Sequence, residues 1–152
     1  MRKEILYLIM TAIGGLILLG TTVYTCIMWQ QAPDQIPLHF DFSGNVTDYG
    51  GKGSMILLLA IAWIAFIGMT ILVKFPKTWN MPVKVTAENA ERLYSITRGM
   101  LEVLKFVMVL LMASIVITTI SGTGFSGTII MVLTVVMLLV IALGMFMLYR
   151  NK

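Results

Sequence analysis

Four blocks of apolar residues, each about as long as one membrane crossing, constrain this chain more than any other feature. The blocks cover residues 5–29, 55–75, 101–120 and 129–149. A helix needs about 20 residues to cross a hydrocarbon layer about 30 Å thick. The backbone must satisfy its own hydrogen bonds in lipid, and the blocks lack the period-two alternation of barrel strands. The sequence therefore predicts an all-α integral membrane protein, a four-helix bundle.

The composition of the whole chain agrees with a single membrane domain over residues 1–152. Hydrophobic residues make up 59% of the chain, and the mean hydropathy is +0.93. This leaves too little polar surface to cover a water-soluble globule. The first apolar block exceeds the length of a signal-peptide core, so we expect it to be a retained span. The single cysteine excludes an intrachain disulfide.

Basic residues gather at both chain ends and between the second and third spans. They are Arg2, Lys3, Lys74, Lys77, Lys84, Arg92, Arg98, Arg150 and Lys152. The positive-inside rule then places both termini and the segment 76–100 in the cytoplasm, and the loop 30–54 on the outer side. We read the net charge of +4 as this topology signal, without a nucleic-acid partner. The expected location is the cell membrane, with a possible homodimer.

The outer loop is expected to be irregular, with one extended stretch. Pro33 and Pro37 prevent an ordinary helix and favour extended backbone. Alternation over residues 38–42 then points His39 and Asp41 to one side and the intervening aromatic rings to the other, toward the bundle. A turn at residues 43–45 would let the chain fold back on itself.

Folding back would bring Asp48 beside His39 and Asp41. One imidazole and two carboxylates could hold a zinc ion or act as a general acid and base, although no other cofactor is expected. The alternative is that these side chains cap turns and bind loop amides. Lys52 is expected to anchor at the membrane interface or to pair with Asp48. The residues expected to bind a ligand or to organise the loop are Pro37, His39, Phe40, Asp41, Gly44, Asp48 and Lys52.

The segment before the third span predicts a helix that starts at residue 87, with Thr86 as its N-cap. Its polar stripe consists of Glu91, Ser95, Arg98, Glu102 and Lys105. Spacings of three and four residues keep these side chains on one helical face. In one interpretation Glu102 pairs with both neighbouring cations and Lys105 reaches the interface. In the other, Glu102 faces a water-filled cavity on an ion or ligand path.

Two motifs resemble a known family. The first is carried by Pro33, Ile36, Pro37, His39, Phe40, Gly44, Asp48 and Lys52. The second runs from Glu88 to Arg92 and continues through Tyr94, Thr97 and Arg98. Together they resemble the domain of unknown function that forms the N-terminal membrane part of SdpI-type immunity proteins. SdpI-type proteins carry further spans after this domain, whereas this sequence has four apolar blocks.

The resemblance implies a bacterial membrane protein whose relatives protect the producer against a secreted peptide toxin and can hold a transcriptional repressor at the membrane. We therefore expect a non-enzymatic recognition protein of immunity or sensor type. Its outer loop would bind a peptide, a lipid headgroup or an ion, and its basic helix would dock a cytoplasmic regulator. The alternatives are a small ion-coupled transporter, in which Glu102 lines the route, and a metal-dependent membrane enzyme that uses His39, Asp41 and Asp48.

Overall fold

The computed structural model describes residues 2–41, 46–121 and 127–152 and is mostly helical. Four of its helices are long and apolar enough to cross a membrane. They are α1 (Arg2–Met28), α2 (Gly53–Leu72), α3 (Ala90–Ser121) and α4 (Gly127–Arg150). The remaining elements are the strands β1 (Gln35–Phe40) and β2 (Val46–Gly51) and the short 3₁₀ helix η1 (Pro76–Thr78).

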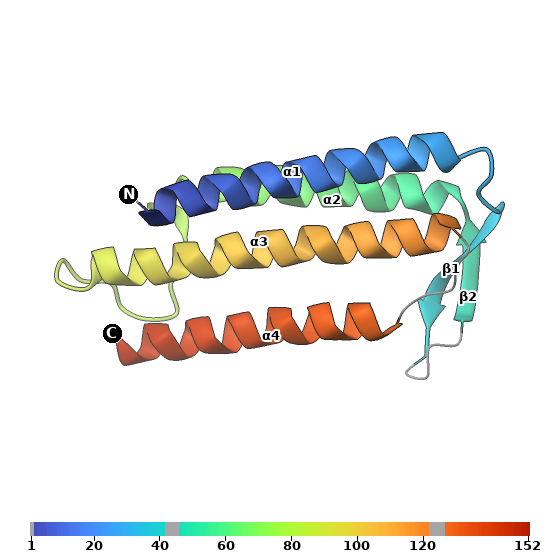
Figure 1. Ribbon diagram of the computed structural model, residues 1–152. Helices are drawn as coiled ribbons and strands as arrows, with labels where there is room; N and C mark the ends of the chain where they lie inside the picture. The colour runs from blue at the N-terminus through green and yellow to red at the C-terminus, as the bar shows by residue number, and fades with distance from the viewer. Residues whose placement is uncertain (1, 42–45, 122–126) are drawn as a thin grey trace.

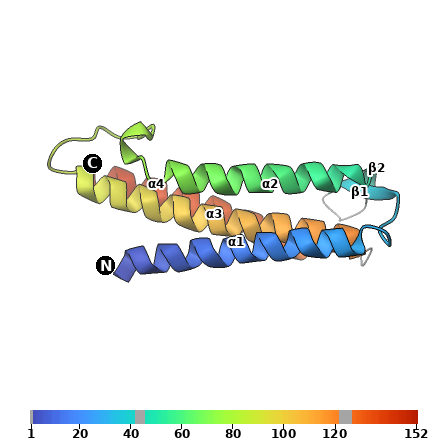
Figure 2. The ribbon, with the colours of Figure 1, turned by 90° about the horizontal axis from the view of Figure 1, so that it is seen from above.

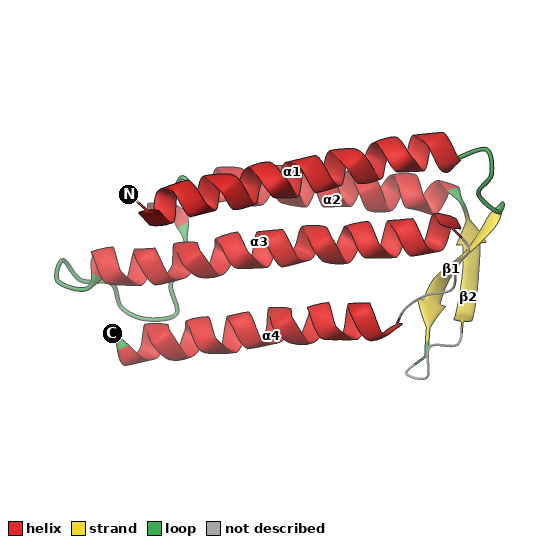
Figure 3. Ribbon diagram, viewed as in Figure 1, coloured by secondary structure: helices red, strands yellow, loops and turns green. Residues whose placement is uncertain are grey.

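The helices run alongside one another in layers. Figure 1 shows α1 and α2 above α3, with α4 below it, and Figure 2 shows α1 and α2 on either side of α3. The central helix α3 therefore packs against each of the other three. Both termini lie at one end, which we call the basic end (Figure 1). The strands lie at the opposite end, the hairpin end (Figure 3).

Packing between the layers rests on a few buried apolar side chains. Leu18 of α1, Phe66 of α2 and Val109 of α3 form one cluster. Gly14 lets the Phe66 ring approach α1, because a Cβ at that position would lie 3.3 Å from the ring. Most of the remaining apolar side chains point outward, and α4 is the least covered helix. An apolar exterior of this kind suits contact with lipid rather than water.

Two local features differ from the sequence predictions. The segment between α1 and α2 contains an antiparallel hairpin instead of an irregular loop. The third helix begins at Ala90 rather than at residue 87. In the turn before it, Oδ1 of Asn89 accepts a hydrogen bond from the Thr86 backbone N–H at 2.8 Å. This bond closes the turn that precedes the helix, and a second bond from Asn89 to the Lys84 carbonyl fixes it.

Candidate functional site

The hairpin presents one polar pair to solvent. In the register of β1 and β2, His39 lies opposite Asp48, with irregular pairing on both sides of His39. Nδ1 of His39 lies 3.3 Å from Oδ2 of Asp48, and the two side chains are 73% and 58% exposed. The chain therefore folds back as the sequence predicted. Tyr49 stands beside the pair on β2 and is also exposed.

The base of the hairpin is fixed to the bundle. Ile36 is buried in a cluster with Met55 of α2 and Ile120 of α3. Lys52 lies 2.9 Å from the Asp34 carboxylate, and its ammonium also sits 5.5 Å from the centre of the Trp29 ring. Lys52 thus clamps the start and the end of the hairpin together, and it does not pair with Asp48 as one prediction held.

The other loop residues predicted to bind a ligand or to organise the loop lie in different places. Asp41 is exposed, and within the described residues no three His, Cys, Asp or Glu side chains are grouped as metal ligands. Pro37 lies opposite Tyr49 in the strand register. Gly44 and the side chain of Phe40 lie outside the described residues. The predicted aromatic contact with the bundle also lies there, because it needs Phe40 and its neighbour at position 42.

At the basic end, the polar stripe of α3 divides into an outer and an inner part. Glu91 and Ser95 are exposed. Arg98 reaches α1, where its two terminal nitrogens contact the two carboxylate oxygens of Glu4 at 2.8 and 2.6 Å. Arg98 also lies over the ring of Tyr7. The predicted pairing of Arg98 with the next carboxylate along α3 is therefore wrong, because a carboxylate on α1 offers a two-pronged contact.

The inner part of the stripe is a buried network between α1 and α3. Nζ of Lys105 lies 2.7 Å from Oε2 of Glu102 and donates a hydrogen bond to Thr11 at 2.8 Å. Thr11 in turn donates to the same Glu102 oxygen at 3.4 Å. The side chains of Lys105 and Glu102 are only 1% and 5% exposed. Lys105 therefore does not extend to the interface as predicted, because it is held inside the bundle, above the Phe66 ring.

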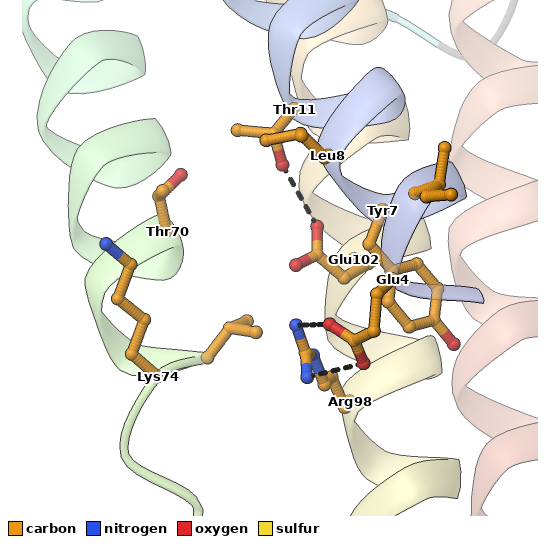
Figure 4. Close-up of a pocket in the computed structure, with 10 residues that line it drawn as sticks. Glu4, Tyr7, Leu8, Thr11, Thr70, Lys74, Arg98 and Glu102 are labelled. Carbon is orange, nitrogen blue, oxygen red and sulfur yellow. Dashed lines mark hydrogen bonds and ion pairs between the residues drawn. The ribbon is translucent and has the colours of Figure 1, made fainter. Parts of the chain in front are cut away.

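A cavity of about 430 Å³ opens beside this network (Figure 4). Its walls come from the start of α1, the end of α2 and the first half of α3. Glu102 lines it, whereas its place on an ion or ligand path stays a prediction. Apart from Arg98, its other polar lining residues were not predicted as site residues from the sequence; they are Glu4, Tyr7, Thr11, Thr70 and Lys74. No specific signal in the sequence marks Thr11, because the same apolar block also contains Thr21, Thr22 and Thr25.

The fold and the two polar regions define a class of protein, a small helical protein with four candidate membrane spans and a structured hairpin between the first two. Residues 16–67 match the family model described as Domain of unknown function (DUF1648). The match covers about the second half of α1, the whole hairpin and most of α2, so it includes the loop motif on which the family resemblance was based. No curated protein and no solved structure matches the chain.

Proposed function

We propose that this chain is a non-enzymatic, multi-pass membrane protein of immunity or sensor type, and that its hairpin binds a peptide on the outer face of the cell membrane. The observation that carries the proposal is the contrast within the hairpin. Its base is fixed by buried Ile36 and by the ion pair of Lys52 and Asp34. Its exposed part presents His39, Asp48 and neighbouring apolar surface to solvent. A rigid support with a solvent-exposed polar pair is what a recognition surface needs.

A peptide is the ligand that this surface suits. Each strand of the two-stranded sheet has a single sheet neighbour, so an extended peptide could add to an outer edge by backbone hydrogen bonds. Tyr49 and Leu38 would supply apolar contact beside such a strand. His39 and Asp48 would bind its polar or charged groups. The basic residues at the opposite end of the molecule favour an outer position for the hairpin.

Survival of cells exposed to secreted peptides tests the proposal. Cells that express the chain are treated with the secreted peptide fraction of the organism that encodes it, and their survival is compared with that of cells carrying an empty vector. We expect protection by the wild type and loss of protection with His39→Ala or Asp48→Ala. Thr47→Ala is the matched control, because Thr47 is exposed on the same strand and lies at the register irregularity next to Asp48 rather than opposite His39.

Two measurements make the outcome decisive. Immunoblots must show equal amounts of each variant in the membrane. In a Cys26→Ser background, a membrane-impermeant maleimide should label Thr47→Cys on intact cells and Lys77→Cys only after permeabilisation. Protection that survives both hairpin substitutions would refute the recognition role of the hairpin. A wild type that protects no better than the vector would refute the immunity function.

A further inference from the structure

The cavity at the basic end has polar groups that the fold does not use internally. Glu4 and Arg98 pair through two short contacts, but Nε of Arg98 is buried without a hydrogen-bond partner among the described residues. Oε2 of Glu102 is taken by Lys105 and Thr11. Within the described part of the chain, the other oxygen of Glu102, Oε1, has no hydrogen-bond partner.

Lys74 stands on the opposite wall of this cavity. It lies two residues after the end of α2, and its side chain runs back along the helix toward Thr70 (Figure 4). No carboxylate among the described residues lies within ion-pair distance of its ammonium group. After the two internal pairs are counted, the cavity therefore keeps the positive charge of Lys74 and the free acceptor of Glu102, together with the buried donor Nε of Arg98.

Lys74 and the free oxygen of Glu102 indicate which chemical groups a ligand would carry. The positive charge on Lys74 favours a ligand group with one negative charge, and a phosphodiester carries one. The carboxylate of Glu102 is already neutralised by Lys105, so its free oxygen suits a neutral donor such as a hydroxyl group. Ile5 and Leu8 line the same cavity and are exposed, which offers an apolar path for an attached acyl chain. The ligand is thus an amphiphile with an anionic, hydroxyl-bearing head.

We propose that this cavity binds the headgroup of an anionic membrane lipid, with the phosphate at Lys74 and a free hydroxyl of the headgroup alcohol donating to Oε1 of Glu102. Basic pockets between membrane helices are known to take lipid headgroups in this way. Phosphatidylglycerol has the required phosphodiester and hydroxyl groups. The proposal is independent of the hairpin, which lies at the other end of the molecule (Figure 1).

Native mass spectrometry of the detergent-purified protein with added lipids tests this assignment. Three lipids with the same acyl chains separate the two contacts: phosphatidylglycerol has charge and hydroxyl groups, phosphatidylmethanol has only the charge, and phosphatidylcholine has neither net charge nor a donor. We expect affinity to fall in that order. Lys74→Gln should weaken phosphatidylglycerol binding about fivefold, the effect of one surface cation on an anionic headgroup.

Lys77→Gln is the matched control, because it removes the same charge three residues further along, in η1, outside the cavity wall. It should bind phosphatidylglycerol as the wild type does. An equal loss in both variants would overturn the proposal, because the effect would then be general surface charge. Equal wild-type affinity for phosphatidylglycerol and phosphatidylmethanol would overturn the contact with Glu102.

The double variant Glu102→Leu/Lys105→Leu tests the same contact while keeping the buried site neutral. Replacing a buried ion pair by apolar residues of similar volume often leaves folding intact. This variant should bind phosphatidylglycerol no better than phosphatidylmethanol, and a preserved preference would contradict the proposed contact. A further arm uses free glycerol 3-phosphate. Competition by it at the concentrations effective for the lipid would assign the cavity to a soluble phosphate ester and overturn the lipid source.

Discussion

At the hairpin end, His39 and Asp48 meet through side chains that are 73% and 58% exposed, whereas at the basic end Lys105 and Glu102 meet through side chains that are 1% and 5% exposed. Water solvates the first pair, and a ligand can reach it without displacing other protein groups. The second pair has given up its water and relies on the bundle for its partners. A contact between a basic and an acidic side chain is thus open to solvent at the hairpin end and part of the packed interior at the basic end.

The difference in burial determines what each pair contributes to the fold. An exposed ion pair is typically worth at most about 1 kcal/mol, because water screens it and two side chains must be ordered. Breaking a buried pair on one side leaves an uncompensated charge in an apolar interior and typically costs about 3–5 kcal/mol. The hairpin pair is therefore free to be used for recognition. The buried pair fixes the contact of α1 with α3 that shapes the cavity.

The largest effect is expected from Glu102→Leu. This change leaves the Lys105 ammonium buried with only Thr11 as a partner, so the free energy of unfolding should fall by about 3–5 kcal/mol. The double variant Glu102→Leu/Lys105→Leu removes both charges and should recover most of that loss. Unfolding in mixed micelles of increasing denaturing detergent measures both. If Glu102→Leu is as stable as the double variant, then water reaches Lys105, and the difference in burial between the two ends does not determine stability.

A smaller effect is expected at the base of the hairpin. Ile36→Ala removes a side chain that is 2% exposed and that joins the hairpin to the helices. The cost should lie near the low end of the about 2–5 kcal/mol typical of such truncations, because the cluster sits at the end of the bundle. Limited proteolysis should cut this variant in the hairpin several times faster than the wild type. Leu38→Ala, at an exposed position of the same strand, is the control, and equal cleavage of both would show that Ile36 does not anchor the hairpin.

Some features of the fold were predictable from the sequence, because a single property such as hydrophobicity or strand alternation determines them. Uninterrupted apolar runs fix the helices, because no other local structure satisfies the backbone over such a length in lipid. Alternation after Pro37 predicted that His39 lies on one side of an extended strand, and the antiparallel pairing of β1 with β2 places Asp48 opposite it. The local order of residues was enough to predict this pair.

The contacts between helices were not predictable in the same way. Which residue of α1 meets Arg98 depends on how far each helix is rotated about its axis, and a uniformly apolar helix carries little information on rotation. Glu4 and Thr11 therefore appeared as partners of the stripe only in the folded structure. Lys74 is a further case, because in the sequence it belongs to the positive-inside signal and only the fold places it on a cavity wall.

The smallest effect on stability is expected at the exposed pair itself. His39→Ala and Asp48→Asn should each change the free energy of unfolding by at most about 1 kcal/mol, because water replaces the lost contact. The same mixed-micelle titration measures this change, and Asp34→Asn gives a matched reference, since Asp34 is also exposed but holds the base of the hairpin through Lys52. A loss of several kcal/mol with His39→Ala would mean that the pair maintains the hairpin and is not available to a ligand. If His39→Ala keeps its free energy of unfolding but loses protection, then His39 serves recognition and not folding. At the other end, by contrast, Glu102 and Lys105 contribute both to stability and to the geometry of the cavity.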